Sequence, residues 1–287
     1  MDGTIMGSNA SIGALICICA LFYLESGTTW MFTILAGALL LWNVKYIGLA
    51  LVAMVLWKYK GLRFGQLFVL LLTGTARFVY SFHAWFGAGY TLTTFHWPNI
   101  YEIVGREAMQ GQLFDPVATV GCFVAVGLLL LGVWVFCQGE WKLTKAVDET
   151  SEDAATRKNG AEIQMLPVLR LLLFFGLAAG DFLPYMDQAY GYLFCVLAVI
   201  LVLVEPKEFL LAAALQIVTF AGYQECVNGE SMMPMWVFAV LQLLVLMYLC
   251  VKLLKEAKVV DLCVRNRLCG RIPDPFRLCV LLWNVSL

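Results

Sequence analysis

Charged side chains are scarce in this sequence. Asp, Glu, Lys and Arg make up 14% of its 287 residues, whereas a water-soluble protein normally carries about 25%. Hydrophobic residues make up 62%, and the mean hydropathy is +0.83. A water-soluble surface cannot be built from this composition. The sequence therefore predicts an all-α polytopic integral membrane protein, a helical bundle of about nine transmembrane or half-length helices.

Catalytic and metal-binding signatures are also missing. The sequence contains no nucleophile elbow, no zinc-protease motif, no C-x-x-C pair and no phosphate-binding glycine loop. Its two histidines cannot form a multi-histidine haem or metal site, and its ten cysteines lie mainly in apolar runs at spacings that match no zinc site. We therefore predict free thiols, no catalytic residues, no cofactor and no metal. The protein is expected not to be an enzyme.

The balance of charge limits the partners. A net charge of −1 without a basic stripe gives no electrostatic basis for binding nucleic acid. The predicted partners are the lipid bilayer and, within it, other membrane subunits or further copies of this chain.

Apolar runs separated by short polar breaks fill two membrane halves. The N-terminal half, residues 1–138, contains runs at 11–24, 30–42, 46–57, 64–89 and 116–137. A mobile polar linker is predicted at 139–164, where four basic and six acidic residues cannot bury enough apolar area to fold alone. The C-terminal half, residues 165–254, contains runs at 165–179, 189–204, 209–222 and 234–251, and a basic tail follows at 255–287.

Basic residues predict the topology. With nine segments and the N-terminus outside, the inner side receives residues 58–63, the linker, Lys207 and the tail, whereas the outer side receives only Lys45 and Arg106. This asymmetry fits the positive-inside rule.

The two halves share a layout of apolar run, acidic glycine-containing turn, apolar run, polar break with a lysine, and apolar run. A longer span follows in each half. This layout predicts an inverted 4+1+4 repeat around the span at 116–137, an architecture of many secondary transporters. The alternative is that any apolar chain cut by regular turns shows such parallels.

The run at 64–89 carries the strongest candidate site. At 100° per residue, Thr73, Arg77, Tyr80 and His83 fall on one helix face, which should point into protein or a wet cavity. An arginine there can hold a carboxylate or phosphate with two hydrogen bonds, and a histidine can relay a proton. Structural alternatives are an ion pair of Arg77 with Asp181 or Asp187, or snorkelling of Arg77 to one interface.

Polar groups in the C-terminal half complete the predicted pathway. Gly180 and Asp181, followed by Pro184, are typical of a helix break that offers a carboxylate to a cation, but also of an ordinary turn between two helices. Asp187 follows this break, and Gln216 interrupts an apolar run, where an interhelical hydrogen bond is the simplest role.

These features give three functional hypotheses. The leading one is transport of a small solute or ion through a polar path between the halves, with Arg77, Tyr80, His83, Thr73, Asp181, Asp187 and Gln216 along it. The second is a non-catalytic membrane subunit or scaffold of a larger complex, respiratory, viral or organellar, for which abundant aromatic and Met residues are suited. The weakest is an intramembrane enzyme that uses His83 or His96 with a carboxylate.

Overall fold

The computed structural model describes residues 6–59, 61–87, 94–104, 116–139 and 164–258. Within these ranges the chain forms ten α-helices and two 3₁₀ helices, and no β-strand. The helices are α1 (Met6–Glu25), α2 (Thr29–Trp42), η1 (Val44–Tyr46), α3 (Ile47–Lys58), α4 (Phe64–Gly87), α5 (Ile100–Val104), α6 (Pro116–Gln138), α7 (Met165–Phe182), α8 (Tyr190–Val204), η3 (Pro206–Glu208), α9 (Phe209–Asn228) and α10 (Met235–Glu256). The predicted linker, except for its two end residues, and the predicted tail beyond residue 258 lie outside the described residues.

Five segments are long and apolar enough to cross a membrane. They are Phe64–Trp85, Pro116–Gln138, Met165–Phe182, Pro206–Asn228 and Met235–Glu256. Three apolar helices are shorter, at Ala10–Glu25, Thr29–Trp42 and Tyr190–Val204, and α3 has 12 residues. The all-helical architecture predicted from composition is confirmed for the described residues, with five helices that are long and apolar enough to cross a membrane.

Local signals set several helix boundaries. Proline opens α6 at Pro116 and η3 at Pro206, where its fixed φ suits the first helical turn. Gly229 ends α9 with a left-handed φ of 75°, which a glycine adopts without steric cost. The turns between apolar runs are therefore encoded in the residues that form them.

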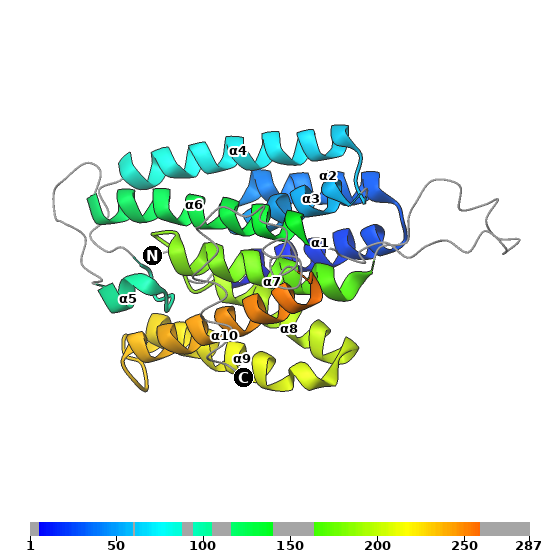
Figure 1. Ribbon diagram of the computed structural model, residues 1–287. Coiled ribbons are helices and arrows are strands. Elements are labelled where there is room, and N and C mark those ends of the chain that lie inside the picture. Colours follow the sequence, from blue (N-terminus) through cyan, green and yellow to red (C-terminus); the bar gives the residue numbers. More distant parts are fainter. Residues whose placement is uncertain (1–5, 60, 88–93, 105–115, 140–163, 259–287) are drawn as a thin grey trace, which may run out of the picture.

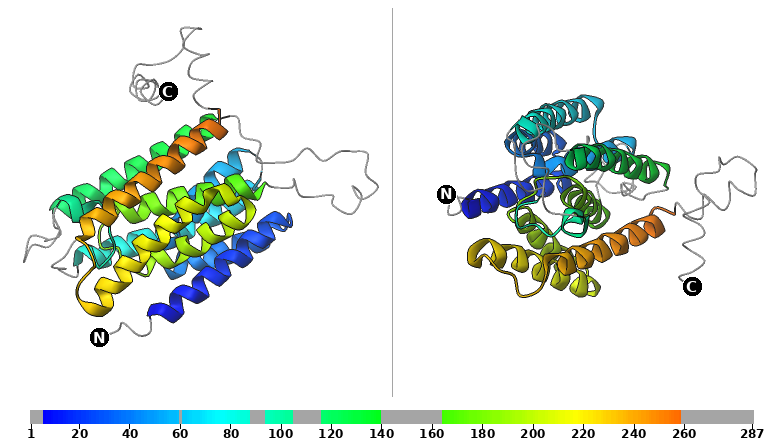
Figure 2. Two further views of the ribbon diagram at one scale, coloured as in Figure 1. Left: turned by 90° about the horizontal axis from the view of Figure 1, so that it is seen from below. Right: turned by 90° about the vertical axis from the view of Figure 1, so that its left-hand side faces the viewer.

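The helices lie roughly side by side, and their ends gather at two ends of the bundle (Figures 1 and 2). We call the end where α6 stops and α7 starts the linker end, and the opposite end the loop end. At the linker end, α1, α3, α8 and α10 also stop, and α2, α4 and α9 start (Figure 1). At the loop end, α4, α7 and α9 stop.

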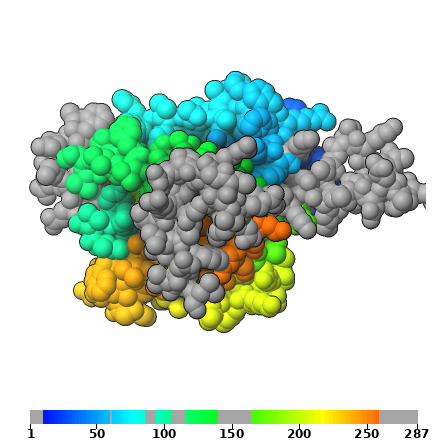
Figure 3. Space-filling model, viewed as in Figure 1, coloured from blue at the N-terminus to red at the C-terminus, as the bar shows by residue number. Residues whose placement is uncertain are grey.

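Helix α7 forms the centre of the bundle and α4 lies at its edge. In α7, 72% of the membrane-length window is buried, compared with 22% in α4. Helices α3, α6, α8 and α10 all pack around α7. Figure 3 shows α4 on the outer surface of the molecule, along the upper edge of this view.

Helices α2 and α3 form a hairpin of two short helices. With 14 and 12 residues they are about 21 Å and 18 Å long, so the η1 turn between them stops beside the middle of α4. A Cβ on Gly74 of α4 would contact Ala50, Ile47 and Leu40 of this hairpin. The η1 turn thereby brings Lys45 beside α4 and the segment between α7 and α8.

Residues 94–99 fill a slot at the loop end. Trp97 is fully buried, with its ring 6.3 Å from that of Tyr190 and 6.4 Å from that of Phe194. Two glycines make the room: a Cβ on Gly191 of α8 would lie 2.6 Å from the Trp97 ring, and one on Gly222 of α9 would lie 2.6 Å from the His96 carbonyl oxygen. The segment thereby packs inside the C-terminal half.

Candidate functional site

A polar cavity lies where the η1 turn, α4 and the segment between α7 and α8 meet. Its volume is about 140 Å³. It is lined by Asn43, Val44, Lys45, Arg77, Ser81, Trp85, Tyr185, Met186, Asp187 and Tyr190. Six of these residues come from the N-terminal half and four from the C-terminal half, so both halves build the cavity.

Two cations and one carboxylate meet in this cavity. Lys45, Arg77 and Asp187 are each half-buried. The Arg77 Nε and one carboxylate oxygen of Asp187, Oδ1, are buried and have no hydrogen-bond partner among the described residues. Burial lowers the pKa of the Lys45 ammonium below its ordinary value, and the Asp187 carboxylate opposes this shift. The cavity therefore holds an excess of positive charge together with unused hydrogen-bonding groups.

Local contacts position these groups. The Asn43 side chain accepts a hydrogen bond from the Lys45 backbone N–H at 3.1 Å and caps η1. On α4, the Arg77 guanidinium lies over the Tyr80 ring, 5.0 Å from its centroid. The segment that carries Asp187 is held by a hydrogen bond from the Phe95 N–H to the Met186 carbonyl at 2.8 Å.

The residues predicted from the sequence are not all in one place. The cavity contains Arg77 and Asp187 but none of the other five. Tyr80 is 64% exposed and His83 is also exposed, so both lie on the outer face of α4.

The remaining three predicted residues are engaged within or between helices. Thr73 donates to the Val69 carbonyl of its own helix at 2.9 Å. Asp181 is fully buried and accepts a hydrogen bond from Gln242 of α10. Gln216 is exposed on α9 and donates to the Cys195 carbonyl at 3.3 Å.

A second charged cluster, which we call the Arg170 cluster, was not among the predicted sites. It is formed by Arg170, Glu205, Glu208, Lys252 and Glu256 near the linker end. Arg170 pairs with all three glutamates, at 3.0 Å for Glu208, and Lys252 pairs with Glu208. The sequence signal was the charge of Arg170 within an apolar run, but its partners lie up to 86 residues away along the chain.

The groups invoked for an enzyme are only loosely arranged. His96 Nδ1 lies 3.9 Å from a Glu225 carboxylate oxygen, which is beyond hydrogen-bond distance. No group of three or more metal-binding side chains lies together in the part of the chain that the structure describes. The cysteines in that part form no disulfide with one another.

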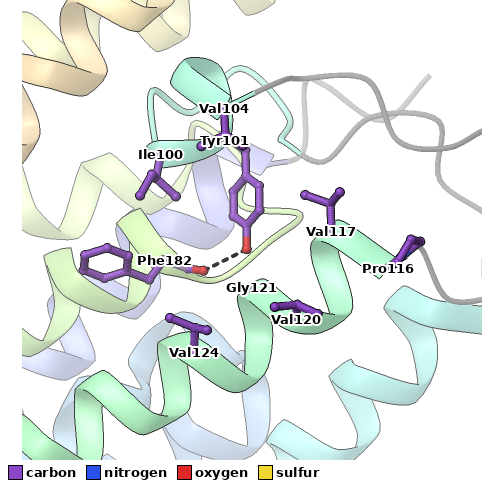
Figure 4. Close-up of a pocket in the computed structure, with 9 residues that line it drawn as sticks. All are labelled: Ile100, Tyr101, Val104, Pro116, Val117, Val120, Gly121, Val124 and Phe182. Carbon is purple, nitrogen blue, oxygen red and sulfur yellow. Dashed lines mark hydrogen bonds between the residues drawn. The ribbon is translucent and has the colours of Figure 1, made fainter.

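A larger cavity of about 470 Å³ lies between α5, α6 and the end of α7 (Figure 4). It is lined by Ile100, Tyr101, Val104, Pro116, Val117, Val120, Gly121, Val124 and Phe182. The one hydroxyl among these side chains, that of Tyr101, donates to the Phe182 carbonyl at 3.0 Å. This cavity offers no charged group and cannot orient a polar solute.

Comparisons with family models, with curated proteins and with solved structures found no significant match to this sequence. Its function has therefore to be inferred from the residues of the chain and their geometry.

Proposed function

We propose that this chain is a multi-pass membrane protein that transports a small anionic solute through the polar cavity between its two halves. The observation that carries the proposal is the convergence of Lys45, Arg77 and Asp187 from both halves, with the Arg77 Nε left without a partner among the described residues. Charged groups inside a membrane bundle are costly, and they are kept where they serve a solute or ion path.

The chemistry of the cavity favours an anion. Two cations against one carboxylate leave one excess positive charge, and a guanidinium binds a carboxylate or phosphate through two parallel hydrogen bonds. Asp187 compensates part of the charge when the cavity is empty. A volume of about 140 Å³ restricts the solute to a small molecule.

The proposal includes the nine-segment topology with the N-terminus outside and the tail inside. Lys58, Arg63 and Lys207 lie near the linker end, which supports placing that end on the inner side. It also includes the inverted repeat, because α2–η1–α3 and α8–η3–α9 have the same order of short helix, 3₁₀ turn and second helix. The packing differs, since α2 lies against α4 whereas α8 has no comparable contact with α10.

Uptake into proteoliposomes tests the proposal. Labelled acetate, succinate and inorganic phosphate are offered to the wild type, to Lys45→Met with Arg77→Met, and to Lys58→Met, which removes an exposed lysine outside the cavity. We expect uptake of at least one anion by the wild type and by Lys58→Met, and none by the double variant. Equal uptake by all three proteins would contradict the proposal.

The second candidate function, a membrane subunit, is favoured by the outer face of α4. Tyr80 and His83 are exposed there on a helix at the edge of the bundle, and polar groups on the outside of a membrane helix favour contact with another chain. Cross-linking from a cysteine introduced at His83 would give a defined adduct with another chain if this candidate is correct. A monodisperse monomer that forms no adduct would exclude it.

A further inference from the structure

Asp181 lies in an environment that does not suit a charged carboxylate. It is the second-last residue of α7 and is fully buried. Its Oδ1 accepts a hydrogen bond from the Gln242 Nε2 of α10. Its other oxygen, Oδ2, and the Gln242 Oε1 have no hydrogen-bond partner among the described residues.

The pair therefore lacks one donor. If Asp181 is ionised, its Oδ2 and the Gln242 Oε1 are both hydrogen-bond acceptors, and neither has a donor. A buried acceptor without a donor is costly. A buried charge without a counter-ion costs more still. One proton on Oδ2 satisfies both oxygens, because the carboxylic acid then donates to the Gln242 Oε1 while its Oδ1 continues to accept from Nε2.

No cation of the surrounding described elements pairs with Asp181. The titratable groups that these elements contribute around this end of α7 are Tyr190 on α8, Tyr101 and Glu102 on α5, Cys122 on α6, and Lys45 and Tyr46 on η1. No described basic residue forms an ion pair with Asp181. Arg170 lies about 16 Å away along the same helix and is already paired with glutamates.

We propose that Asp181 and Gln242 form a buried proton-binding site, in which Asp181 carries a proton and donates it to the Gln242 carbonyl oxygen. The proton can leave only when α7 and α10 separate or water enters. Asp181 therefore stays protonated as long as these two helices are packed together. The preceding residue, Gly180, packs closely against a residue of the polar cavity: a Cβ on Gly180 would lie 3.2 Å from both the Trp97 Nε1 and the ring of Tyr190, which lines the cavity.

Infrared absorption of the purified full chain in lipid bilayers tests the site. At about pH 8, where an ordinary aspartate is ionised, we expect Asp181→Asn to remove a carboxylic-acid C=O band from the spectrum. Asp187→Asn is the matched control and should leave this acid band in place. Loss of a carboxylate band in Asp181→Asn would overturn the proposal.

A second measurement keeps the proposal testable if Asp181→Asn does not fold. In the wild type labelled with ¹³C at the aspartate carboxyl, the acid band should move to lower frequency, and in labelled Gln242→Leu it should move up because its hydrogen bond to the amide is lost. Gln216→Leu, on an exposed face of α9, should leave the band in place. A spectrum without an isotope-sensitive acid band would refute the site. This readout does not depend on uptake of any solute, so it is separate from the test of the transport proposal.

Discussion

The Arg170 cluster and the polar cavity each bring charges of both signs into an apolar bundle, yet they differ in how those charges are used. In the Arg170 cluster, Arg170 and Glu208 are almost fully buried, and each contacts more than one partner. In the polar cavity, the three charged side chains are half-buried around an open volume, and two of them keep buried polar atoms without a described partner.

We interpret this difference as one between a structural role for the Arg170 cluster and the binding role that we propose for the polar cavity. In the Arg170 cluster every charged side chain already has a counter-ion, although the buried Arg170 Nε has no hydrogen-bond partner among the described residues. These ion pairs fix the relative positions of α7, η3 and α10. An unsaturated group of charges in a cavity pays a desolvation cost that a bound solute can remove. In the Arg170 cluster, two cations face three carboxylates, so the net formal charge is −1. In the polar cavity, two cations face one carboxylate, so the net formal charge is +1.

The largest effect is expected from breaking the Arg170 cluster. Arg170→Met leaves Glu208, which is 1% exposed, with Lys252 as its remaining described counter-ion, and it removes the arginine that pairs with Glu205 and Glu256. Removal of one member of a buried ion pair typically costs about 3 to 5 kcal/mol. We expect the yield of folded protein, measured by size-exclusion chromatography in detergent, to fall strongly.

Two further variants sharpen this result. Lys207→Met removes an exposed charge next to Glu208 and should leave the yield unchanged. Arg170→Met combined with Glu208→Gln removes both charges and should recover part of the yield. Full yield of the single variant would show that the cluster contributes nothing to folding.

The next largest effect is expected at Arg77. Here we expect a loss of solute binding without a loss of folded protein, the opposite of the result expected for Arg170. Arg77→Ala should keep its folded yield, because Arg77 is half-buried and forms no ion pair with a described residue. Solute affinity should fall about 10- to 100-fold, because the variant loses one or two charge-assisted hydrogen bonds to the solute. Arg77→Lys should not restore it, because lysine lacks the planar fork.

Binding isotherms and yields are measured on the same preparations. Low yield of Arg77→Ala that is rescued by Asp187→Asn would instead assign Arg77 to a structural ion pair.

A smaller effect is the pH dependence of binding. The pKa of Lys45 is lowered by burial and partly restored by Asp187, so affinity for an anion should fall as the pH rises through this lowered pKa and the ammonium loses its proton. Asp187→Asn removes the opposing carboxylate, lowers the pKa of Lys45 further and should move the loss of affinity to lower pH. In Lys45→Met, this loss of affinity with rising pH should be absent. A shift to higher pH in Asp187→Asn would contradict the assignment.

The smallest effect is expected at Tyr80. Its ring stacks on the Arg77 guanidinium at the outer face of α4, and an exposed contact of this kind is worth about 0.5 to 1 kcal/mol. Tyr80→Leu should weaken solute affinity by about two- to fivefold by loosening the arginine, and Tyr80→Phe should not. A loss as large as that of Arg77→Ala would place Tyr80 in the binding site itself.

The helices could be predicted from the sequence because their signals are local. The run at 116–137 corresponds to α6 at Pro116–Gln138, and the run at 189–204 corresponds to α8 at Tyr190–Val204. The run at 209–222 was cut short, because Glu225 marked a loop by its charge. In the structure α9 continues to Asn228, with Glu225 buried near His96.

The candidate site could be predicted only in part, because its members meet through tertiary packing. Arg77 was identified by its charge within a span, a local signal. Its neighbour Lys45 was predicted only as a residue of the outer side, because nothing local shows that η1 packs against α4 and the segment between α7 and α8. The partners of Arg170 and the pairing of Asp181 with Gln242 join residues 35 to 86 positions apart, for which a single sequence carries no signal.

The slot that holds residues 94–99 has a consequence for the order of assembly. Its walls come from α7, α8 and α9, which are synthesised after the segment that fills it. During synthesis, therefore, the Trp97 side chain emerges before its site exists, and it can dock only when the second half of the chain has entered the membrane. Burial of Trp97 marks the completion of the whole bundle, so a membrane-inserted N-terminal half made alone would keep this indole exposed and accessible to a quencher.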